Sequence, residues 1–166
     1  MPTTYDPIAT TTLTNSTTSE VIFNTFGSGY TDLRIVFNGA STAGTTEFQA
    51  QFNSDSTGVY SRTRLTGNGS AAGSSRDSGV TFARFTGVGY LPATTLAGHA
   101  MIEILNYSNP NTFKTIVSRY GVYTQESNLM INLWRKTDAI TSIRLYVSAN
   151  NFVSGSSFSL YGIRAA

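Results

Sequence analysis

Cysteine is absent from this sequence, and charged residues are scarce. Without cysteine the chain can form neither a disulfide nor a thiolate metal site. Only 12% of the 166 residues are charged, about half the share usual in globular proteins. The two lysines, Lys114 and Lys136, leave few strong helix formers, which argues against a helical fold.

The positive charge is too sparse for a nucleic-acid-binding surface. The formal net charge is only +2, and the arginines are scattered without a basic run. A nucleic-acid-binding protein gathers such residues into a patch or stripe. Residues 1–25 also lack the basic start and apolar stretch of a secretory signal, and no window resembles a membrane helix. We therefore expect neither nucleic acid nor a membrane as a partner.

Aromatic and small polar residues are plentiful instead. The chain has 10 phenylalanines and 9 tyrosines, together with many threonines, serines and glycines. Aromatic and β-branched residues favour strands, whereas serine, asparagine and glycine favour turns. Disordered chains are poor in aromatics, so this composition predicts an all-β globular protein.

Several segments alternate apolar and polar residues with the period of two that is typical of half-buried strands. Examples are Leu33, Ile35 and Phe37 in one segment and Phe158, Leu160 and Gly162 in another. The predicted strands are Ile8–Leu13, Ser19–Phe23, Asp32–Phe37, Glu47–Phe52, Val80–Phe85, Gly98–Tyr107, Phe113–Val122, Leu129–Arg135, Ser142–Val147 and Ser157–Ile163. About eight to ten strands at this spacing predict an antiparallel β-sandwich, for which we prefer a jelly-roll-like architecture.

Two segments interrupt the pattern. Residues 1–18 are polar and threonine-rich, and we interpret them as an extended N-terminal arm that leads into an edge strand. Residues 19–166 then form a single β-sandwich domain. Within it, the long polar segment 53–79 is predicted to be a loop that carries a short hairpin arm made of residues 59–60 and 62–65.

The sequence offers little catalytic chemistry. His99 is the only histidine and is predicted to lie on the strand face opposite Ile102 and Ile104. Asn53-x-Asp55-x-Thr57-Gly58 imitates half of a calcium loop, but Arg64 stands where the last carboxylate should be, so an Asx turn is the better interpretation. No Gly-x-Ser-x-Gly elbow is present. We predict a protein that is not an enzyme and has no cofactor.

Two further sets of residues are candidates for chemistry or binding. Paired carboxylates for glycoside hydrolysis would have to come from Asp32, Glu47, Asp55 and Glu103. Aromatic residues that could stack on sugars, or pack between subunits, are Tyr5, Tyr60, Tyr90, Tyr107, Tyr123 and Trp134.

Motifs spread along nearly the whole chain resemble those of small virion proteins from bacteriophages of cyanobacteria and other aquatic bacteria. These motifs are Tyr5–Leu13, Tyr30–Leu33, Phe52–Ser56 leading to Tyr60-Ser61, Ile104–Ser108 before Lys114-Thr115, Ala139–Ile143 and Gly155–Ile163. The resemblance implies a virion structural protein of the capsid-decoration or tail-associated type, assembled in the host cytoplasm. It brings no catalytic residues with it.

From this resemblance we expect a non-enzymatic capsid decoration, or cement, protein that binds other virion proteins such as the major capsid protein. The alternative is a tail, baseplate or fibre component, including a carbohydrate-binding module that recognises a host surface glycan. Copies are expected to associate, as trimers or otherwise around a symmetry axis. The residues predicted to contact a neighbour by strand addition are Tyr5, Pro7, Ile8, Thr10, Thr11, Thr12 and Leu13.

Overall fold

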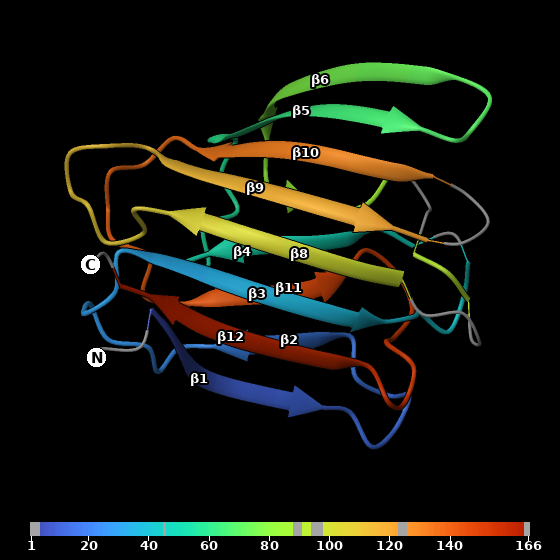
Figure 1. Ribbon diagram of the computed structural model, residues 1–166, viewed down its shortest axis with the longest axis horizontal. Helices are drawn as coiled ribbons and strands as arrows, with labels where there is room; N and C mark the ends of the chain where they lie inside the picture. Colours follow the sequence, from blue (N-terminus) through green and yellow to red (C-terminus); the bar gives the residue numbers. More distant parts are fainter. Residues whose placement is uncertain (1–3, 45, 88–90, 94–97, 123–125, 165–166) are drawn as a thin grey trace.

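The computed structural model describes residues 4–44, 46–87, 91–93, 98–122 and 126–164, and every regular element in them is a strand (Figure 1). The strands are β1 (Tyr5–Thr12), β2 (Glu20–Phe23), β3 (Asp32–Gly39), β4 (Phe48–Phe52), β5 (Tyr60–Gly67), β6 (Ala72–Val80), β7 (Ala83–Arg84), β8 (Gly98–Leu105), β9 (Lys114–Gly121), β10 (Ser127–Trp134), β11 (Ile143–Val147) and β12 (Ser157–Ile163). No helix in these residues could cross a membrane.

The strands form two antiparallel sheets that pack face to face, which confirms the predicted β-sandwich. The larger sheet has the order β1-β12-β3-β8-β9-β10-β5-β6, and the smaller has the order β2-β11-β4-β7. Figure 1 shows the larger sheet in front of β2, β4 and β11. Eight strands, β1-β12-β3-β8 facing β2-β11-β4-β7, follow the jelly-roll order of two interlocked Greek keys.

Two hairpins are added to this jelly roll, and one of them, β5–β6, accounts for the two strands beyond the ten that the sequence predicted. Hairpin β5–β6 is inserted between β4 and β7, and hairpin β9–β10 is inserted between β8 and β11. Hairpin β9–β10 pairs with β8, and hairpin β5–β6 pairs with β10, so that only the larger sheet becomes wider. The added strands therefore extend one sheet sideways without changing the jelly-roll core.

The core lies between the inner faces of the two sheets. Leu33, Ile35 and Phe37 on β3 face Phe48, Ala50 and Phe52 on β4, and all six side chains have no exposed surface. This arrangement confirms the alternation predicted for both strands. At its centre, the Phe48 ring lies 4.3 Å from the ring of Phe37. Aromatic rings therefore join the two sheets.

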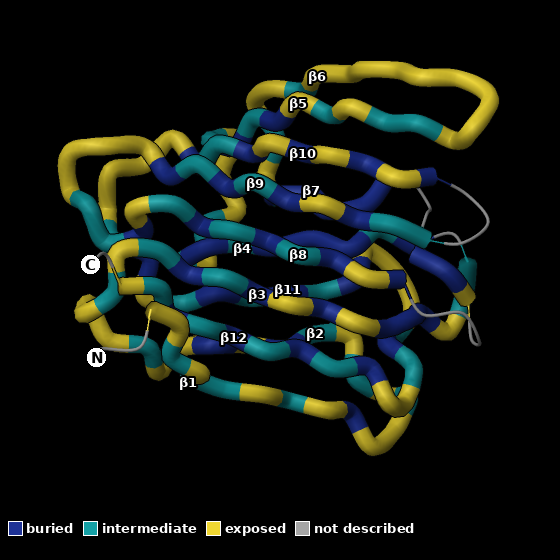
Figure 2. The backbone as a smooth tube through the Cα atoms, in the orientation of Figure 1, coloured by how far each residue is buried: buried dark blue, intermediate teal, exposed yellow. Residues whose placement is uncertain are grey.

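The polar segment 53–79 contains more structure than its sequence predicted. Instead of a short hairpin arm inside a loop, it holds β5 and most of β6, which pair along eight residues of β5. β6 lies at the edge of the sheet and is exposed on both faces along nearly its whole length (Figure 2). A strand that is exposed to solvent on both faces does not need apolar residues at every second position. This explains why no strand was predicted for β6.

Ion pairs hold this hairpin against the smaller sheet. Arg62 on β5 donates to the Asp77 carboxylate on β6 at 2.7 Å, and Arg84 on β7 lies 3.9 Å from the same carboxylate. Arg84 also donates to Glu47 at 2.8 Å. Burial, together with the nearby Arg84 charge, lowers the pKa of Arg62. The inner face of the hairpin is thus polar where the rest of the sandwich is apolar.

The predicted strand Val80–Phe85 is wrong in its extent. Val80 is the last residue of β6, and β7 contains only Ala83 and Arg84. Gly79 adopts a positive φ of 70°, and the pairing register with β5 shifts beside it, so the chain turns before it reaches the other sheet. One predicted strand is therefore divided between the two sheets.

Candidate functional site

The outer face of the larger sheet carries a row of side chains that are apolar except for Arg119. Strand register places Val36, Met101, Arg119, Leu129 and Leu65 side by side across β3, β8, β9, β10 and β5. In the next row, Val117 lies beside Ile131, and Leu133 follows two residues further along β10. We call the seven apolar members the aliphatic face: Val36, Leu65, Met101, Val117, Leu129, Ile131 and Leu133.

Much of the aliphatic face is open to solvent. Leu65 is 52% exposed and Ile131 is 45% exposed, whereas most apolar side chains on the inner face of the same sheet are almost completely buried. A shallow hollow of about 840 Å³ lies over this surface, with Val36, Leu65, Met101 and Leu129 among its lining residues. Large exposed apolar patches on soluble proteins mark sites of interaction.

Few charges accompany this surface. Arg34 on β3 donates to the Glu103 carboxylate on β8, and Arg119 on β9 lies 4.0 Å from the same carboxylate. The Arg119 guanidinium also donates to the sulfur of Met101 at 3.3 Å. Arg76 stands in the same row as Glu103, at the far edge on β6. Arg119 therefore lies within the aliphatic face, between Met101 and Leu129, whereas Arg34, Glu103 and Arg76 border it.

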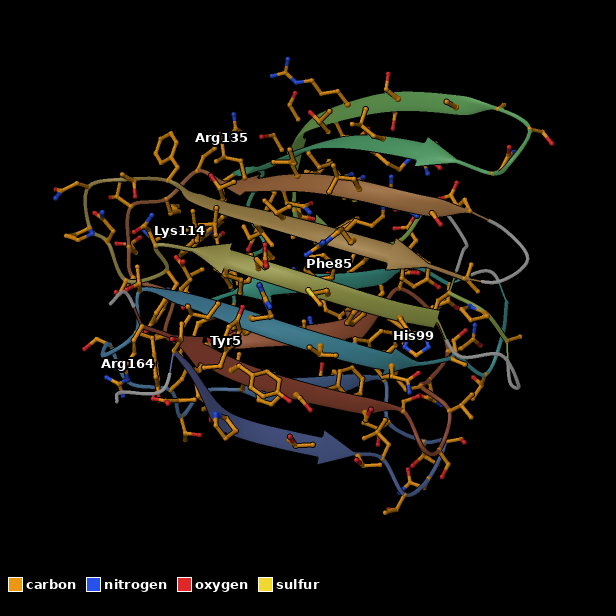
Figure 3. All side chains as sticks on the ribbon, in the orientation of Figure 1. Tyr5, Phe85, His99, Lys114, Arg135 and Arg164 are labelled. Carbon is orange, nitrogen blue, oxygen red and sulfur yellow. The ribbon has the colours of Figure 1, made fainter. Side chains whose placement is uncertain are left out.

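His99 borders the same hollow. It lies on the outer face of β8 and is exposed, whereas Ile102 and Ile104 are buried on the inner face, as the sequence predicted. Figure 3 shows its ring near one end of the sheet. The described residues contain no group of three or more histidine, aspartate or glutamate side chains that could hold a metal ion. His99 is therefore part of a surface and not of a metal centre within this part of the chain.

The calcium-like segment forms an Asx turn, which confirms that interpretation. The Oδ1 atom of Asp55 accepts a hydrogen bond from the Thr57 backbone N–H at 2.9 Å. Its Oδ2 atom accepts from the indole N–H of Trp134 at 3.0 Å. Both carboxylate oxygens are therefore engaged by the protein itself. Burial alone would raise the pKa of Asp55, but the hydrogen bonds from Thr57 and Trp134 outweigh it and lower the pKa.

We expect Asp55→Ala to lower the free energy of unfolding by about 1–3 kcal/mol at pH 7, because the buried Trp134 N–H loses its acceptor. A carboxylate whose pKa is lower in the folded state stabilises the protein above its ordinary pKa and loses this effect as the pH falls. The difference between Asp55→Ala and the parent should therefore shrink below about pH 4. Urea unfolding at pH 7 and pH 3 measures it. Ser56→Ala, an exposed change in the same turn, is the control, and an equal loss there would contradict the prediction.

The four carboxylates considered for glycoside hydrolysis are all engaged by other groups. The contacts are Asp55 with Thr57 and Trp134, Glu47 with Arg84, Glu103 with Arg34, and Asp32 with the Asn106 backbone N–H. Three of the four thus bind an arginine or the indole of a tryptophan. Their arrangement stabilises turns and neighbouring strands.

The aromatic candidates do not gather on the aliphatic face. Trp134, Tyr60 and Tyr107 are each at most 2% exposed and belong to the core. Tyr5 is exposed, but it lies on the edge strand β1, where the Arg34 guanidinium stacks over its ring. Tyr90 and Tyr123 lie outside the described residues. Because sugar-binding surfaces use exposed aromatic rings, this aliphatic surface is better suited to protein.

The residues predicted to contact a neighbour lie together on the open edge of the larger sheet. Tyr5, Pro7, Ile8 and Thr10–Thr12 belong to β1, which pairs on one side with β12 of the same chain. The register shifts between Pro7 and Ala9. Leu13 follows the strand and is buried in the core, so that its side chain is directed inward.

Comparisons of this chain with family models, with curated proteins and with solved structures find no match. Its function must therefore be inferred from the residues and surfaces described above.

The aliphatic face was not predicted from the sequence, although a signal for it was present. Five of the six residues in Leu129–Trp134 are apolar, and only Asn132 interrupts the run. A nearly continuous apolar run is typical of a strand that is covered on both faces. In this strand the inner side chains Met130 and Trp134 are covered by the protein, whereas Leu129 and Ile131 are exposed.

Proposed function

We propose that this chain is a non-enzymatic structural protein of a bacteriophage virion, and that it decorates the capsid by binding capsid proteins. The observation that carries the proposal is the open edge of the larger sheet at β1, since an unpaired strand edge gives a jelly-roll protein a site that can accept a strand of another protein. The motifs shared with small virion proteins support the virion as the place of that contact.

Strand β1 offers this contact through its backbone. It is the outermost strand of the larger sheet, so one row of its backbone N–H and C=O groups has no strand of the described residues beside it. Such an edge can accept a strand from another chain. β1 contains one charged residue, Asp6, whose carboxylate binds Arg164 of the same chain at 2.9 Å. The edge is therefore only weakly protected by charge, which favours pairing with a capsid-protein strand.

Cryo-electron microscopy of virions that contain this chain tests the proposal. We expect regular copies over the capsid lattice, with β1 against capsid-protein seams. Particles assembled with a chain that lacks residues 1–11 should lose this density. That deletion keeps Leu13, whose backbone N–H donates to the Ser156 carbonyl at 2.9 Å, and the folded state of the shortened chain is checked by its thermal unfolding.

Three outcomes would contradict this proposal. Density confined to the tail, baseplate or fibres would replace capsid decoration with host adsorption or tail assembly as the function. Unchanged incorporation of the shortened chain into capsids would show that β1 is not the contact. A chain absent from purified particles would overturn the virion role altogether.

A further inference from the structure

We propose that the aliphatic face is covered by the same face of a second copy of this chain, in a two-fold dimer whose axis runs along β10. The dimer is independent of the virion role, because it concerns only how the chain associates with itself. One partner and one relative placement of the two larger sheets are therefore specified.

The double-sided character of β10 is the first observation that favours this dimer. The strand lies inside the sheet, between β9 and β5, and has apolar side chains on both faces. Interior strands with two apolar faces normally have protein on both sides. Here the smaller sheet and its connections cover Met130 and Trp134, whereas no described residue covers Leu129 and Ile131. A second protein layer is what this strand lacks.

The size of the face also suits a dimer interface. Between β3 and β6 the sheet has six strands, which at the usual spacing extend over roughly 24 Å. Along the strands, four outward-facing rows extend over roughly 20 Å. The flat area is therefore about 500 Å², and the relief of the side chains brings the accessible area closer to the roughly 800 Å² that each partner contributes to a standard interface. Two such faces can pack as aligned sheets about 10 Å apart, as in an ordinary β-sandwich.

Charge complementarity fixes the placement of the axis. Glu103 on β8 lies two strands from β10 on one side, and Arg76 on β6 lies two strands from it on the other side. Both belong to the row that contains Ile131. Rotation about an axis along β10 therefore places Glu103 opposite the partner's Arg76, and the pair occurs twice. Arg76 is exposed and makes no ion pair with any described residue of its own chain.

The same rotation keeps the apolar side chains together. Ile131 meets the partner's Ile131 near the axis, and Arg119 lies over the partner's Leu65, which the aliphatic part of the arginine can cover. Arg34 lies on β3, one strand beyond Glu103, and stays at the rim where water reaches it. No buried charge is left without a partner, which a face-to-face dimer requires.

Sedimentation equilibrium of the purified chain over micromolar concentrations tests the proposal. We expect a dimer, and we expect Ile131→Asp to raise its dissociation constant at least about 100-fold, because the change occurs twice at the axis. Ile22→Asp is the matched control: Ile22 is 51% exposed, on β2 of the smaller sheet, and this variant should dimerise like the parent. Thermal unfolding shows whether both variants are folded.

The ion pair tests the placement of the axis separately. Arg76→Glu should weaken the dimer roughly tenfold, since both copies lose an attraction and gain a repulsion. Combining it with Glu103→Gln should weaken the dimer little further, because the same ion pair is already lost. This arm also remains informative if Ile131→Asp fails to fold, because Arg76 is exposed.

Three results would overturn the inference. A parent chain that stays monomeric at all concentrations excludes the dimer. Dimerisation that survives in folded Ile131→Asp, or that is lost in Ile22→Asp, assigns the contact to another surface. An Arg76→Glu variant with the dissociation constant of the parent excludes the axis along β10.

Discussion

Replacing Phe48 by alanine is expected to lower the free energy of unfolding by about 3–5 kcal/mol, a large part of the total stability of a single domain. Phe48 belongs to the smaller sheet, and its ring centre lies 4.3 Å from that of Phe37 and 6.3 Å from that of Phe158, both on the larger sheet. It also contacts the rings of Phe85 and Phe152. Removal of this ring leaves a cavity that four aromatic neighbours cannot close without leaving their rotamers.

Phe113→Ala is the matched control, because Phe113 is 51% exposed. It should change the free energy of unfolding by less than about 0.5 kcal/mol, as is usual for surface substitutions. Guanidinium unfolding of the two variants and the parent, under one set of conditions, measures the difference. Similar losses in both variants would show that Phe48 is not the link between the sheets.

Raising the pH above 10 is expected to destabilise the protein strongly. Burial raises the pKa of both Tyr60 and Tyr120 above the ordinary value of 10.0, with a smaller contribution from the nearby Asp55 and Glu126 charges. Above pH 10 the unfolded chain therefore releases protons that the folded chain retains. Stability conferred by the neutral phenols is complete below pH 10 and is lost as the pH rises toward the folded-state pKa. The loss is about 1.4 kcal/mol per phenol for each pH unit that the solution rises within this window.

Denaturant unfolding at pH 9 and pH 11 checks this expectation. Tyr60→Phe should be less stable than the parent at pH 9, because the Tyr60 hydroxyl accepts from the Phe52 backbone N–H at 3.0 Å and donates to the Asp55 carbonyl at 3.1 Å. It should nevertheless lose less stability between pH 9 and pH 11 than the parent. Tyr5→Phe, at an exposed position, should keep the slope of the parent. A parent whose stability is equal at both pH values would refute the expectation.

The strands that could be predicted from the sequence are those with one buried face and one solvent-exposed face. Leu33, Ile35 and Phe37 recur at every second position because the inner face of their strand packs against the core, and such a pattern can be recognised without knowing the neighbouring strands. β6 was not predicted, because ion pairs from Asp77 to Arg62 and Arg84 hold it in place. A strand held by ion pairs does not need apolar residues at every second position. From the sequence, the strand order could be predicted only as a general architecture, a jelly roll, because strand pairing depends on contacts between distant segments.

The candidate site was predicted only in part for the same reason. The β1 residues could be proposed as a contact because Pro7 and the threonines are typical of an edge strand. The aliphatic face is built from five strands, and each contributes one or a few exposed apolar residues. A single exposed apolar residue, such as Val36 or Leu65, is common on protein surfaces and indicates nothing by itself. Only the register, which places Val36, Met101 and Leu129 in one row, makes them a surface.

The strand order also determines when the protein can fold during its synthesis. β12 lies between β1 and β3, and β11 lies between β2 and β4, so each sheet of the jelly roll needs a strand from the last quarter of the chain. While the ribosome is still producing residues 143–163, the first four strands lack the neighbour that joins them. Folding of both sheets must therefore wait until β11 and β12 have been synthesised, and pairing over such long sequence separations is slow. Until then, the early strands carry apolar side chains of the future core, such as Leu33, Phe37 and Phe48, without the neighbours that later cover them.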